Sequence, residues 1–254
     1  MLNKTEQITI IIPARNEEES ILQTLQEIEK KVSVPYKLIV INDHSDDQTY
    51  KTVSQYIATK KNYSLINNKQ QPGFAAAIRI GFKKATTPYV VVVMADLCDN
   101  PQTINKMFLK INQGWDIVCG SRYTEGGRKV GGSLLQGLCS RFVCFSLSYL
   151  LRIPTSDISN AFKMYRREIL HNIYIDMTHG VETSMEITLQ AFFQNAKITE
   201  IPTVWRGRVK GQSKFKIIQR TPKYGEIYLW AILKGIGDAI GFDFPLNRRG
   251  KRVI

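Results

Sequence analysis

The first half of the chain alternates short apolar runs with amphipathic segments, and this alternation restricts the fold more than any other sequence feature. β-Branched and other apolar residues fill 8–12, 37–41 and 89–94. Between these runs, apolar residues recur three and four positions apart, which is typical of helices. Strands alternating with helices predict a doubly wound, mostly parallel α/β sheet. Strands without polar alternation fit burial on both faces.

The predicted elements follow this pattern as far as about Tyr123. We expect strands at 8–12, 37–41, 63–66, 89–94 and 116–120, and helices at 18–32, 46–57, 73–85 and 103–111. Beyond Tyr123 the regularity is lost. There we expect a glycine-rich basic stretch over 124–132, a core or oligomer helix over 133–151, a helix over 180–195, a strand over 198–204, a basic loop over 206–216, an aromatic amphipathic segment over 224–242 and a polar basic tail.

Composition limits the classes of partner. The chain of 254 residues has a net charge of +13, and its last 50 residues hold twelve Lys and Arg against three Asp and Glu. Such a basic end suggests phosphate groups, a nucleic acid or an anionic membrane surface. The polar N-terminus and the lack of an uninterrupted apolar run of 18 residues predict neither a secretion signal nor a membrane-spanning helix. Four cysteines without a CxxC pair argue against a zinc site and indicate a reducing, cytoplasmic compartment.

Charged and polar side chains follow the predicted strands where each one ends. Ligands of doubly wound sheets bind beyond these carboxyl ends. The residues concerned are Pro13, Arg15 and Glu17 after the first strand, Asp43 after the second, Ala95, Asp96 and Asp99 after the strand at 89–94, and Arg122 after the strand at 116–120. Asp and Asn also occur at strand ends as helix caps and turn formers. Their gathering at one edge favours a cation or sugar hydroxyls, with Asp96 as the best ligand for Mg²⁺ or Mn²⁺ and Asp99 as a helper or a helix cap.

Two further segments fit anions. Gly73 begins a helix of small residues, which suits either a phosphate at the helix N-terminus or close packing of helix on sheet, and the sequence leaves both open. The segment 205–214 interleaves Arg206, Arg208 and Lys214 with glycines and Ser213, which favours a folded phosphate clamp over a solvated loop. Flanking cations and aromatic residues in 224–242 suit contact with a membrane surface.

Seven motifs in order resemble glycosyltransferase family 2, whose members have the GT-A fold. They are IIPARNE, VINDHSDDQT, PGFAAAIRIGFKKA, VVVMADLCDNP, GSRY, DISNAFKMYRREIL and IPTVWRGRVKGQSKF. The last three are most similar to the dolichyl-phosphate mannose synthases and other polyprenyl-phosphate glycosyltransferases. The resemblance implies a GT-A domain over 1–216, with a nucleotide-sugar half at 1–123 and an acceptor half at 124–216, followed by an amphipathic basic segment at 217–254.

The resemblance also implies roles for individual residues. Pro13, Arg15, Glu17, Asp43, Gly73 and Ala95 would bind the donor; Asp96, with Asp99, would bind Mg²⁺ or Mn²⁺; Arg122, Asp157 and Arg208 would serve the reaction; and Ser159, Arg206, Arg208, Ser213 and Lys214 would hold the acceptor and its phosphate. Met94 replaces the first Asp of the family's DxD motif, and Cys98 replaces a Gln often found beyond it. The implied metal site therefore has one carboxylate fewer.

The implied reaction is an inverting transfer of a sugar from a nucleotide sugar to a polyprenyl phosphate. An anionic lipid phosphate needs no general base, so the enzyme positions it and neutralises the leaving diphosphate. The expected location is peripheral, on the cytoplasmic face of a membrane, with a membrane-anchoring partner protein as an option. Transfer to a sugar hydroxyl, with Asp157 as base, and a non-catalytic nucleotide- or lipid-binding role are the alternatives. The basic residues lack a nucleic-acid reading motif, so no nucleic acid is expected.

Overall fold

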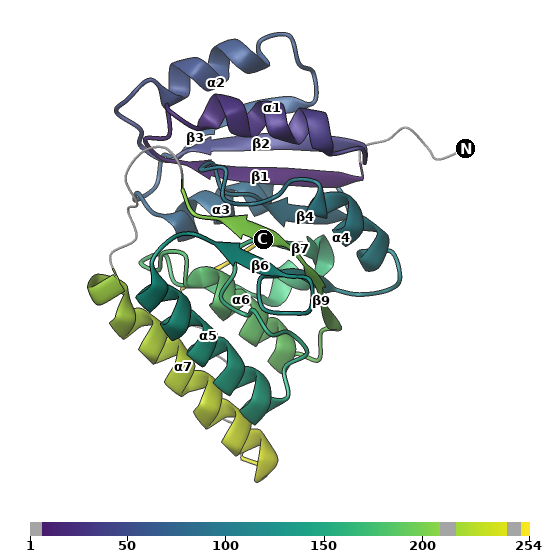
Figure 1. Ribbon diagram of the computed structural model, residues 1–254, viewed down its shortest axis with the longest axis vertical. Helices are drawn as coiled ribbons and strands as arrows, with labels where there is room; N and C mark the ends of the chain where they lie inside the picture. The colour runs from purple at the N-terminus through teal and green to yellow at the C-terminus, as the bar shows by residue number, and fades with distance from the viewer. Residues whose placement is uncertain (1–6, 209–216, 243–249) are drawn as a thin grey trace.

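A seven-stranded sheet runs through the middle of the protein (Figure 1) in the computed structural model, which describes residues 7–208, 217–242 (217–220 as backbone only) and 250–254. The strand order is β3-β2-β1-β4-β7-β5-β9. All neighbours are parallel except β7, which is antiparallel to both β4 and β5. The strands are β1 (Ile8–Ala14), β2 (Tyr36–Asn42), β3 (Tyr63–Asn67), β4 (Tyr89–Val92), β5 (Ile117–Ser121), β7 (Lys163–Arg166) and β9 (Ile198–Pro202). The predicted doubly wound, mostly parallel sheet is confirmed.

Helices cover both faces of this sheet. Side chains of α1 (Ile21–Lys31), α2 (Thr49–Ile57) and α4 (Thr103–Ile111) share one core cluster, while α3 (Phe74–Lys84) and α6 (Thr183–Phe193) belong to the other. Alternate residues of β1 enter opposite clusters, as the continuous apolar strand predicts. The small residues of α3 serve packing, because a Cβ on Gly81 would lie 2.3 Å from Cγ2 of Ile11. This contact favours the packing role for the helix after Gly73.

Three predicted strands differ from the observed ones by two residues or more, and the one expected over 89–94 ends at Val92. β1 continues through Pro13 to Ala14, which stay in register with Ile41 and Asn42 of β2. On the β4 side the Val93 N–H donates to the carbonyl of Ile11, and Pro13, which has no N–H, cannot extend the ladder beyond this bond. The expected strand over 198–204 is two strands: β9 pairs with β5, whereas β10 (Val204–Arg206) pairs in parallel with β6 (Arg128–Val130). Strand β7 was not predicted, although it lies in the middle of the sheet.

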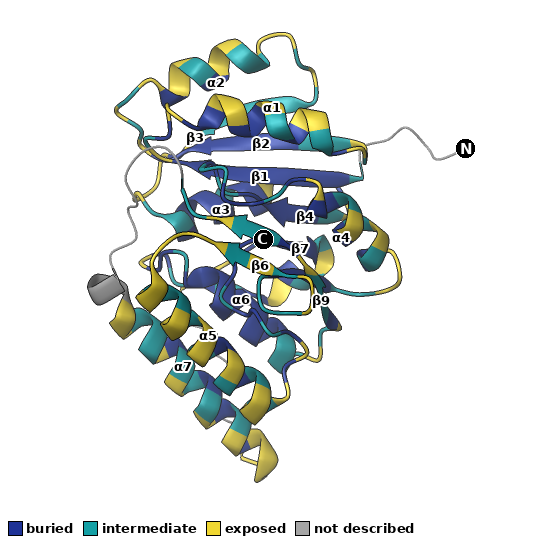
Figure 2. Ribbon diagram, viewed as in Figure 1, coloured by how far each residue is buried: buried dark blue, intermediate teal, exposed yellow. Residues whose placement is uncertain are grey.

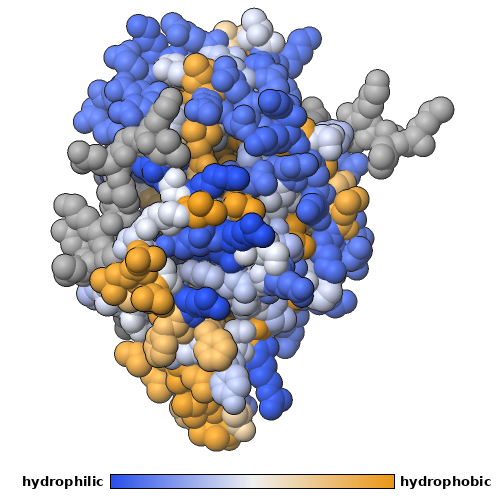
Figure 3. Space-filling view, in the orientation of Figure 1, coloured by the Kyte–Doolittle hydropathy of each residue, from blue (hydrophilic) through white to orange (hydrophobic). Residues whose placement is uncertain are grey.

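The second half adds a pair of long helices, α5 (Leu134–Leu151) and α7 (Ile217–Ala239), below the sheet in Figure 1. Their facing sides enclose a small apolar cluster with α6. Of the two alternatives expected for 133–151, a core helix or an oligomer helix, the first is wrong, because only Cys144 and Leu147 of α5 are buried. The second stays a prediction. Within the described part of the chain, α5 is the one helix long and apolar enough to cross a membrane by length and composition. Figure 2 shows the exposed outer side of α5, and Figure 3 shows apolar side chains gathered over this end of the molecule.

The chain returns to the sheet domain after α7. Strand β11 (Lys251–Arg252) pairs antiparallel with β8 (Tyr174–Ile175), and Val253 is fully buried in the second core cluster. The Arg79 Nε donates to the carbonyl of Arg252 at 2.7 Å. The predicted polar basic tail, 247–252, is described only over 250–252, where Lys251 and Arg252 are exposed but form a strand, and the apolar Val253 that follows them docks in the core. The division at residue 216 stays a prediction.

Candidate functional site

Glu17 is the first carboxylate beyond β1, and the local backbone fixes its position. Asn16 has a positive φ of 51°, which turns the chain away from the strand. The Glu17 N–H donates to Oγ1 of Thr49 at 2.8 Å, and Ser20 donates to Oε2 of Glu17 at 3.1 Å. Glu17 therefore sits at the carboxyl edge of the sheet with its carboxylate held by defined partners.

Asp43 follows β2 at the same edge and accepts two hydrogen bonds. The Asn68 side-chain amide donates to Oδ1 at 2.7 Å, and the Gly73 backbone N–H donates to Oδ2 at 2.9 Å. Gly73 has a φ of 152°, a conformation that a side chain would strain. The glycine thus serves the carboxylate rather than an open phosphate site. A hollow of about 300 Å³ adjoins Asp43 and is lined by Asn42, His44, Ser45, Tyr50, Asn67 and Asn68.

Arg208 reaches across the sheet edge to two of the predicted donor residues. Its guanidinium donates to both carboxylate oxygens of Glu17, at 2.7 and 2.9 Å, and lies 3.3 Å from Oδ2 of Asp96. Burial lowers the pKa of Arg208, but the hydrogen bond to Glu17 and the charge of Asp96 outweigh it and raise the pKa. A residue 191 positions from Glu17 therefore supplies the neutralising cation at this edge.

A short two-stranded ribbon positions Arg208. The Arg206 N–H donates to the carbonyl of Cys98 at 2.9 Å, and the Gly207 N–H donates to that of Val130 at 2.7 Å. A Cβ on Gly207 would lie 2.6 Å from the backbone nitrogen of Gly132, so the two chains meet where only glycine fits. The ribbon of β6 and β10 thereby fixes the start of the predicted clamp next to residues 94–99, the predicted metal-binding loop. Ser213 and Lys214 lie outside the described residues.

The predicted metal-binding loop, 94–99, offers only two carboxylates, Asp96 and Asp99. Asp96 accepts the Cys98 N–H through Oδ1 and faces Arg208 through Oδ2. Asp99 accepts the Met94 N–H at 3.2 Å, and burial together with the nearby charge of Asp96 raises its pKa to about 7. In the part of the chain that the structure describes, no three His, Cys, Asp or Glu side chains gather as metal ligands. Mg²⁺ often uses only one or two protein carboxylates beside substrate phosphates, and Asp96 fits that minimum.

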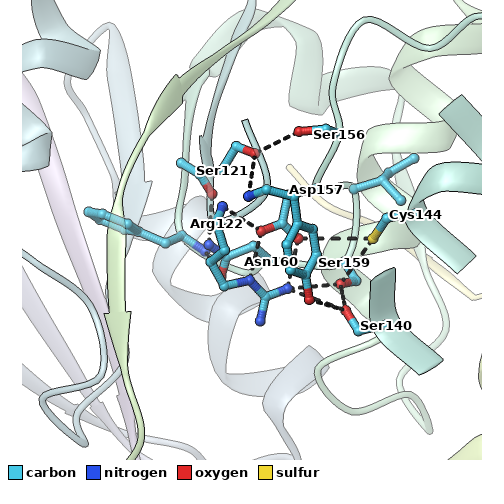
Figure 4. A network of polar contacts seen from close by, with 12 residues as sticks. Ser121, Arg122, Ser140, Cys144, Ser156, Asp157, Ser159 and Asn160 are labelled. Atoms are coloured by element: carbon cyan, nitrogen blue, oxygen red, sulfur yellow. Dashed lines mark hydrogen bonds and ion pairs between the residues drawn. The ribbon is translucent and has the colours of Figure 1, made fainter. Parts of the chain in front are cut away.

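A second arginine lies at the end of β5 and is almost completely enclosed (Figure 4). The Arg122 guanidinium donates to both oxygens of Asp157 at 2.7 Å, and the Arg122 backbone N–H adds a bond of 2.9 Å. The side chain of Arg122 is 11% exposed and that of Asp157 is 0% exposed. Burial alone lowers the pKa of Arg122, but the charge and hydrogen bonds of Asp157 raise it. Arg122 is thus a fixed cation.

Serine and cysteine side chains complete this network. The Arg122 Nη2 also donates to Ser159 at 3.1 Å and to Ser140 of α5 at 3.4 Å. The Cys144 thiol lies 3.4 Å from Oγ of Ser159 and keeps its proton, because burial raises its pKa. Asp157 and Ser159, predicted from the motif, are therefore brought together with Arg122. Ser140 and Cys144 were missed, since their segment was expected to be an apolar core or oligomer helix.

Four further residues of the predicted site are described by the structure: Pro13, Arg15, Ala95 and Arg206. Pro13 and Ala95 are buried at strand ends, and the Ala95 carbonyl accepts from Thr24 at 2.9 Å. Arg15 and Arg206 are exposed at the rim. Asn68, which holds Asp43, was missed, although its place just after β3 could have revealed it by the rule that ligand-binding residues follow strands. The individual site assignments stay predictions.

Comparison with known proteins gives three kinds of match. The family model described as "Glycosyl transferase family 2" matches residues 9–174. A dolichol-phosphate mannosyltransferase of Pyrococcus furiosus is 28% identical over 82% of this chain, which spans 59% of that relative's length. A dolichyl-phosphate hexose transferase of Haloferax volcanii is 26% identical over 82% of this chain and 86% of its own.

Solved structures agree in fold. Glucosyl-3-phosphoglycerate synthase of Mycobacterium tuberculosis, crystallised with Mn²⁺, UDP-glucose and phosphoglyceric acid, superposes with a TM-score of 0.67 at 17% identity, covering 91% of this chain and 80% of that one. The same enzyme with Mn²⁺, UDP and glucosyl-3-phosphoglycerate has a TM-score of 0.65. At this identity the likeness shows a shared fold, GT-A, and nothing about substrates.

Proposed function

The chain belongs to glycosyltransferase family 2, and we propose on this basis that it transfers a sugar from a nucleotide-sugar donor to a polyprenyl phosphate at a membrane surface. The relatives named for dolichol phosphate support the choice of acceptor. The chain covers less than two thirds of the Pyrococcus furiosus relative, so the proposed activity rests on the site of this chain as well as on the likeness.

One observation carries the proposal: the β6–β10 ribbon lies between a carboxylate edge and an apolar helix pair. On one side it presents Arg208 to Glu17 and Asp96. On the other side it is continuous with α5, because Lys129 of β6 donates to the carbonyl of Ser133 at the start of that helix. A substrate with an anionic head and a hydrocarbon tail matches this order of cation and apolar surface.

The outer faces of α5 and α7 support binding to a membrane. Large apolar side chains on α5 are between 58 and 84% exposed, and they are Leu134, Leu135, Leu138, Phe142, Phe145, Tyr149 and Leu150. Leu229, Leu233 and Ile236 of α7 are also at least half exposed. An exposed apolar patch of this kind on a soluble monomer marks an interaction site. We place it against the cytoplasmic face of a membrane, where basic residues meet anionic headgroups. A membrane-anchoring partner protein stays a prediction.

The reaction follows from the chemistry of the acceptor. A phosphate oxygen of the lipid forms a bond to the anomeric carbon, while the bond from that carbon to the diphosphate oxygen breaks. The electron pair leaves with the nucleoside diphosphate, and a single displacement inverts the configuration. Arg208 neutralises phosphate charge, and Arg122 provides a fixed cation beside Ser159. A divalent ion on Asp96 would add Lewis-acid neutralisation of the leaving diphosphate when bound.

Transfer to a sugar hydroxyl is less well supported. It needs a general base, and Asp157 was the candidate. Both oxygens of Asp157 accept from the guanidinium of Arg122, and its side chain is 0% exposed. A carboxylate engaged in this way is poorly placed to take a proton from an acceptor. This geometry favours the phosphate acceptor, whose attack needs no base.

The test is a donor screen with a matched pair of acceptors. The full chain would be incubated with Mg²⁺ or Mn²⁺, a panel of nucleotide sugars and vesicles holding either a short polyprenyl phosphate or the corresponding polyprenol. Release of nucleoside diphosphate with the phosphate but not with the alcohol is expected. Release of nucleoside diphosphate at the same rate with and without either lipid would favour a hydroxyl acceptor on another molecule. Folded protein that binds a nucleotide sugar yet releases nothing would favour the non-catalytic role.

A further inference from the structure

Ser140 stands out among the serines of α5 because its hydroxyl contacts side chains of other elements rather than a nearby backbone carbonyl. Ser146 donates to the carbonyl of Val143 in its own helix, and Ser148 donates to the carbonyl of Ile153 just beyond it. Such local bonds are the ordinary use of a serine in a helix. The Ser140 hydroxyl instead contacts Arg122, Tyr123 and Ser159 of the reaction centre (Figure 4).

The hydrogen-bond capacity of Ser140 is filled by these three contacts. A hydroxyl offers one donor and two acceptor sites. Arg122 Nη2 donates to it at 3.4 Å, and the Tyr123 hydroxyl donates at 3.2 Å. The Ser140 and Ser159 hydroxyls lie 2.8 Å apart, and either can be the donor. Ser140 thus connects the guanidinium to Ser159 through a single side chain.

The same helix presents the apolar face proposed to meet a membrane. Leu138 and Phe142, two residues to either side of Ser140, are 67 and 69% exposed. Ser140 and Cys144, one turn apart, point the other way and contact the reaction centre. A rigid helix cannot move its outer face without moving its inner face. Any displacement of α5 on contact with lipid therefore reaches Arg122 through Ser140.

We propose that Ser140 is a positioning residue that ties the Arg122–Asp157 pair to the seating of α5 at the membrane. The inference rests on the proposed function, because it assumes that a lipid-borne phosphate is the acceptor. Membrane contact of α5 then holds the guanidinium in the orientation needed for transfer.

The activity test compares Ser140→Ala with Ser146→Ala, which removes an equally half-buried hydroxyl from the same helix. Ser140→Ala should bind vesicles as the wild type does and keep KM for the donor within about twofold. Its kcat on the vesicle-borne acceptor should fall by about tenfold, as for loss of one hydrogen bond to a charged group. Ser146→Ala should match the wild type, and Ser140→Thr, which keeps the hydroxyl, should recover most of the rate. Equal kcat values for Ser140→Ala and Ser146→Ala would overturn the proposal.

A second readout needs no turnover. In protein labelled with ¹⁵N-arginine, the Arg122 Nε–H signal should shift when lipid bicelles are added. In Ser140→Ala that shift should be lost, while binding to bicelles is kept. A shift that persists in Ser140→Ala would overturn the tie between α5 and Arg122. If the wild type transfers no sugar but shows the Ser140-dependent shift, the proposed acceptor fails and the positioning role survives.

Discussion

Two arginine–carboxylate pairs lie at the carboxyl edge of the sheet, and they differ in enclosure. Arg122 and Asp157 are almost wholly buried and are surrounded by serines and a cysteine. Arg208 and Glu17 have side chains that are 16 and 10% exposed, and Asp96 lies within reach of the same guanidinium. The first pair joins the end of β5, in the predicted nucleotide-sugar half, to a loop of the predicted acceptor half. The second joins residues 191 positions apart, across the predicted donor site.

This difference suggests separate tasks. A buried bidentate pair holds its geometry because either partner alone would be an uncompensated charge. The Arg208 pair is less completely enclosed, so a competing anion or cation that enters this edge can separate its members. The Arg122 pair is therefore a fixed frame for the reaction. The Arg208 pair occupies the carboxylates predicted to bind donor and metal, so it must rearrange when those ligands enter.

Breaking the enclosed pair should have the largest effect. Asp157→Asn leaves Arg122 buried without a counter-charge, which costs about 3–5 kcal/mol in a buried pair. We expect a loss of that size in the free energy of unfolding measured with urea. Asp116→Asn is the control, since Asp116 pairs with Arg166 at 3.0 Å but both side chains are more than 20% exposed. Comparable losses in the two variants would show that enclosure does not distinguish the pairs.

Another pair, His179 and Glu186, is buried and extends the comparison, because the charge of a histidine changes near neutral pH. His179 Nδ1 lies 2.9 Å from Oε2 of Glu186, with both side chains buried, and Asp176 and Lys223 are the other charged groups nearby. Burial lowers the pKa of His179, but its bond to Glu186 and the charge of that group outweigh burial and raise the pKa.

The sign follows from that direction. A raised pKa in the folded protein adds stability that is full below the ordinary pKa of His, about 6.5, and is lost as pH rises through the folded value. The free energy of unfolding should therefore fall as pH rises above about 6.5. Glu186→Gln should cost about 1–3 kcal/mol at low pH and flatten that slope. His171→Gln, in the 3₁₀-helix Arg167–Asn172, is the control. If the pH dependence stays in Glu186→Gln and vanishes in His171→Gln, then it comes from His171 and the assignment to His179 is wrong.

Changing the rim pair should affect the reaction more than the fold. Arg208→Lys keeps the charge but loses the two-point contact with Glu17, which a lysine cannot reproduce. We expect transfer to fall by about 10–100-fold, or roughly 1.4–2.8 kcal/mol, while the unfolding temperature stays close to the wild type. Arg252→Lys is the control, because Arg252 contacts the Tyr174 ring and no carboxylate of the site. Normal kcat and KM in Arg208→Lys would show that the pair of Arg208 and Glu17 has no role in the reaction.

The sheet could be predicted because its strands are continuous apolar runs that bury both faces. The edge carboxylates followed from the rule that ligands bind beyond strand ends, which brought Glu17, Asp43 and Asp96 to one edge. Strand β7 could not be predicted in the same way, because its segment KMYR is short and polar at both ends. Its Lys163 is fully buried and donates to the Ile158 and Ser184 carbonyls, which no local pattern indicates.

The partners of the two arginines show the limit more sharply. The motif DISNAFKMYRREIL predicted Asp157 and Ser159, but their contacts with Ser140 and Cys144 depend on how α5 docks. Helix α5 is apolar nearly all round, so its sequence does not say which side faces inward. Similarly, the contact between Arg208 and Glu17 depends on the β6–β10 ribbon, which forms only because Gly207 allows the backbone of Gly132 to approach. Tertiary contacts decide both, and they lie beyond periodicity.

The smallest effect on stability is expected on the outer face of α5, where the comparison moves from charge to apolar surface. Leu138 of α5 and Leu109 of α4 are 67 and 68% exposed. Replacing either with Gln should change the free energy of unfolding by no more than about 0.5 kcal/mol, because neither is packed in a core. Flotation with anionic vesicles should separate them: Leu138→Gln should bind more weakly, since a methylene group buried in lipid contributes about 0.8 kcal/mol, and Leu109→Gln should bind like the wild type. Equal losses would mean that binding is set by overall charge, and the apolar face of α5 would then need another occupant.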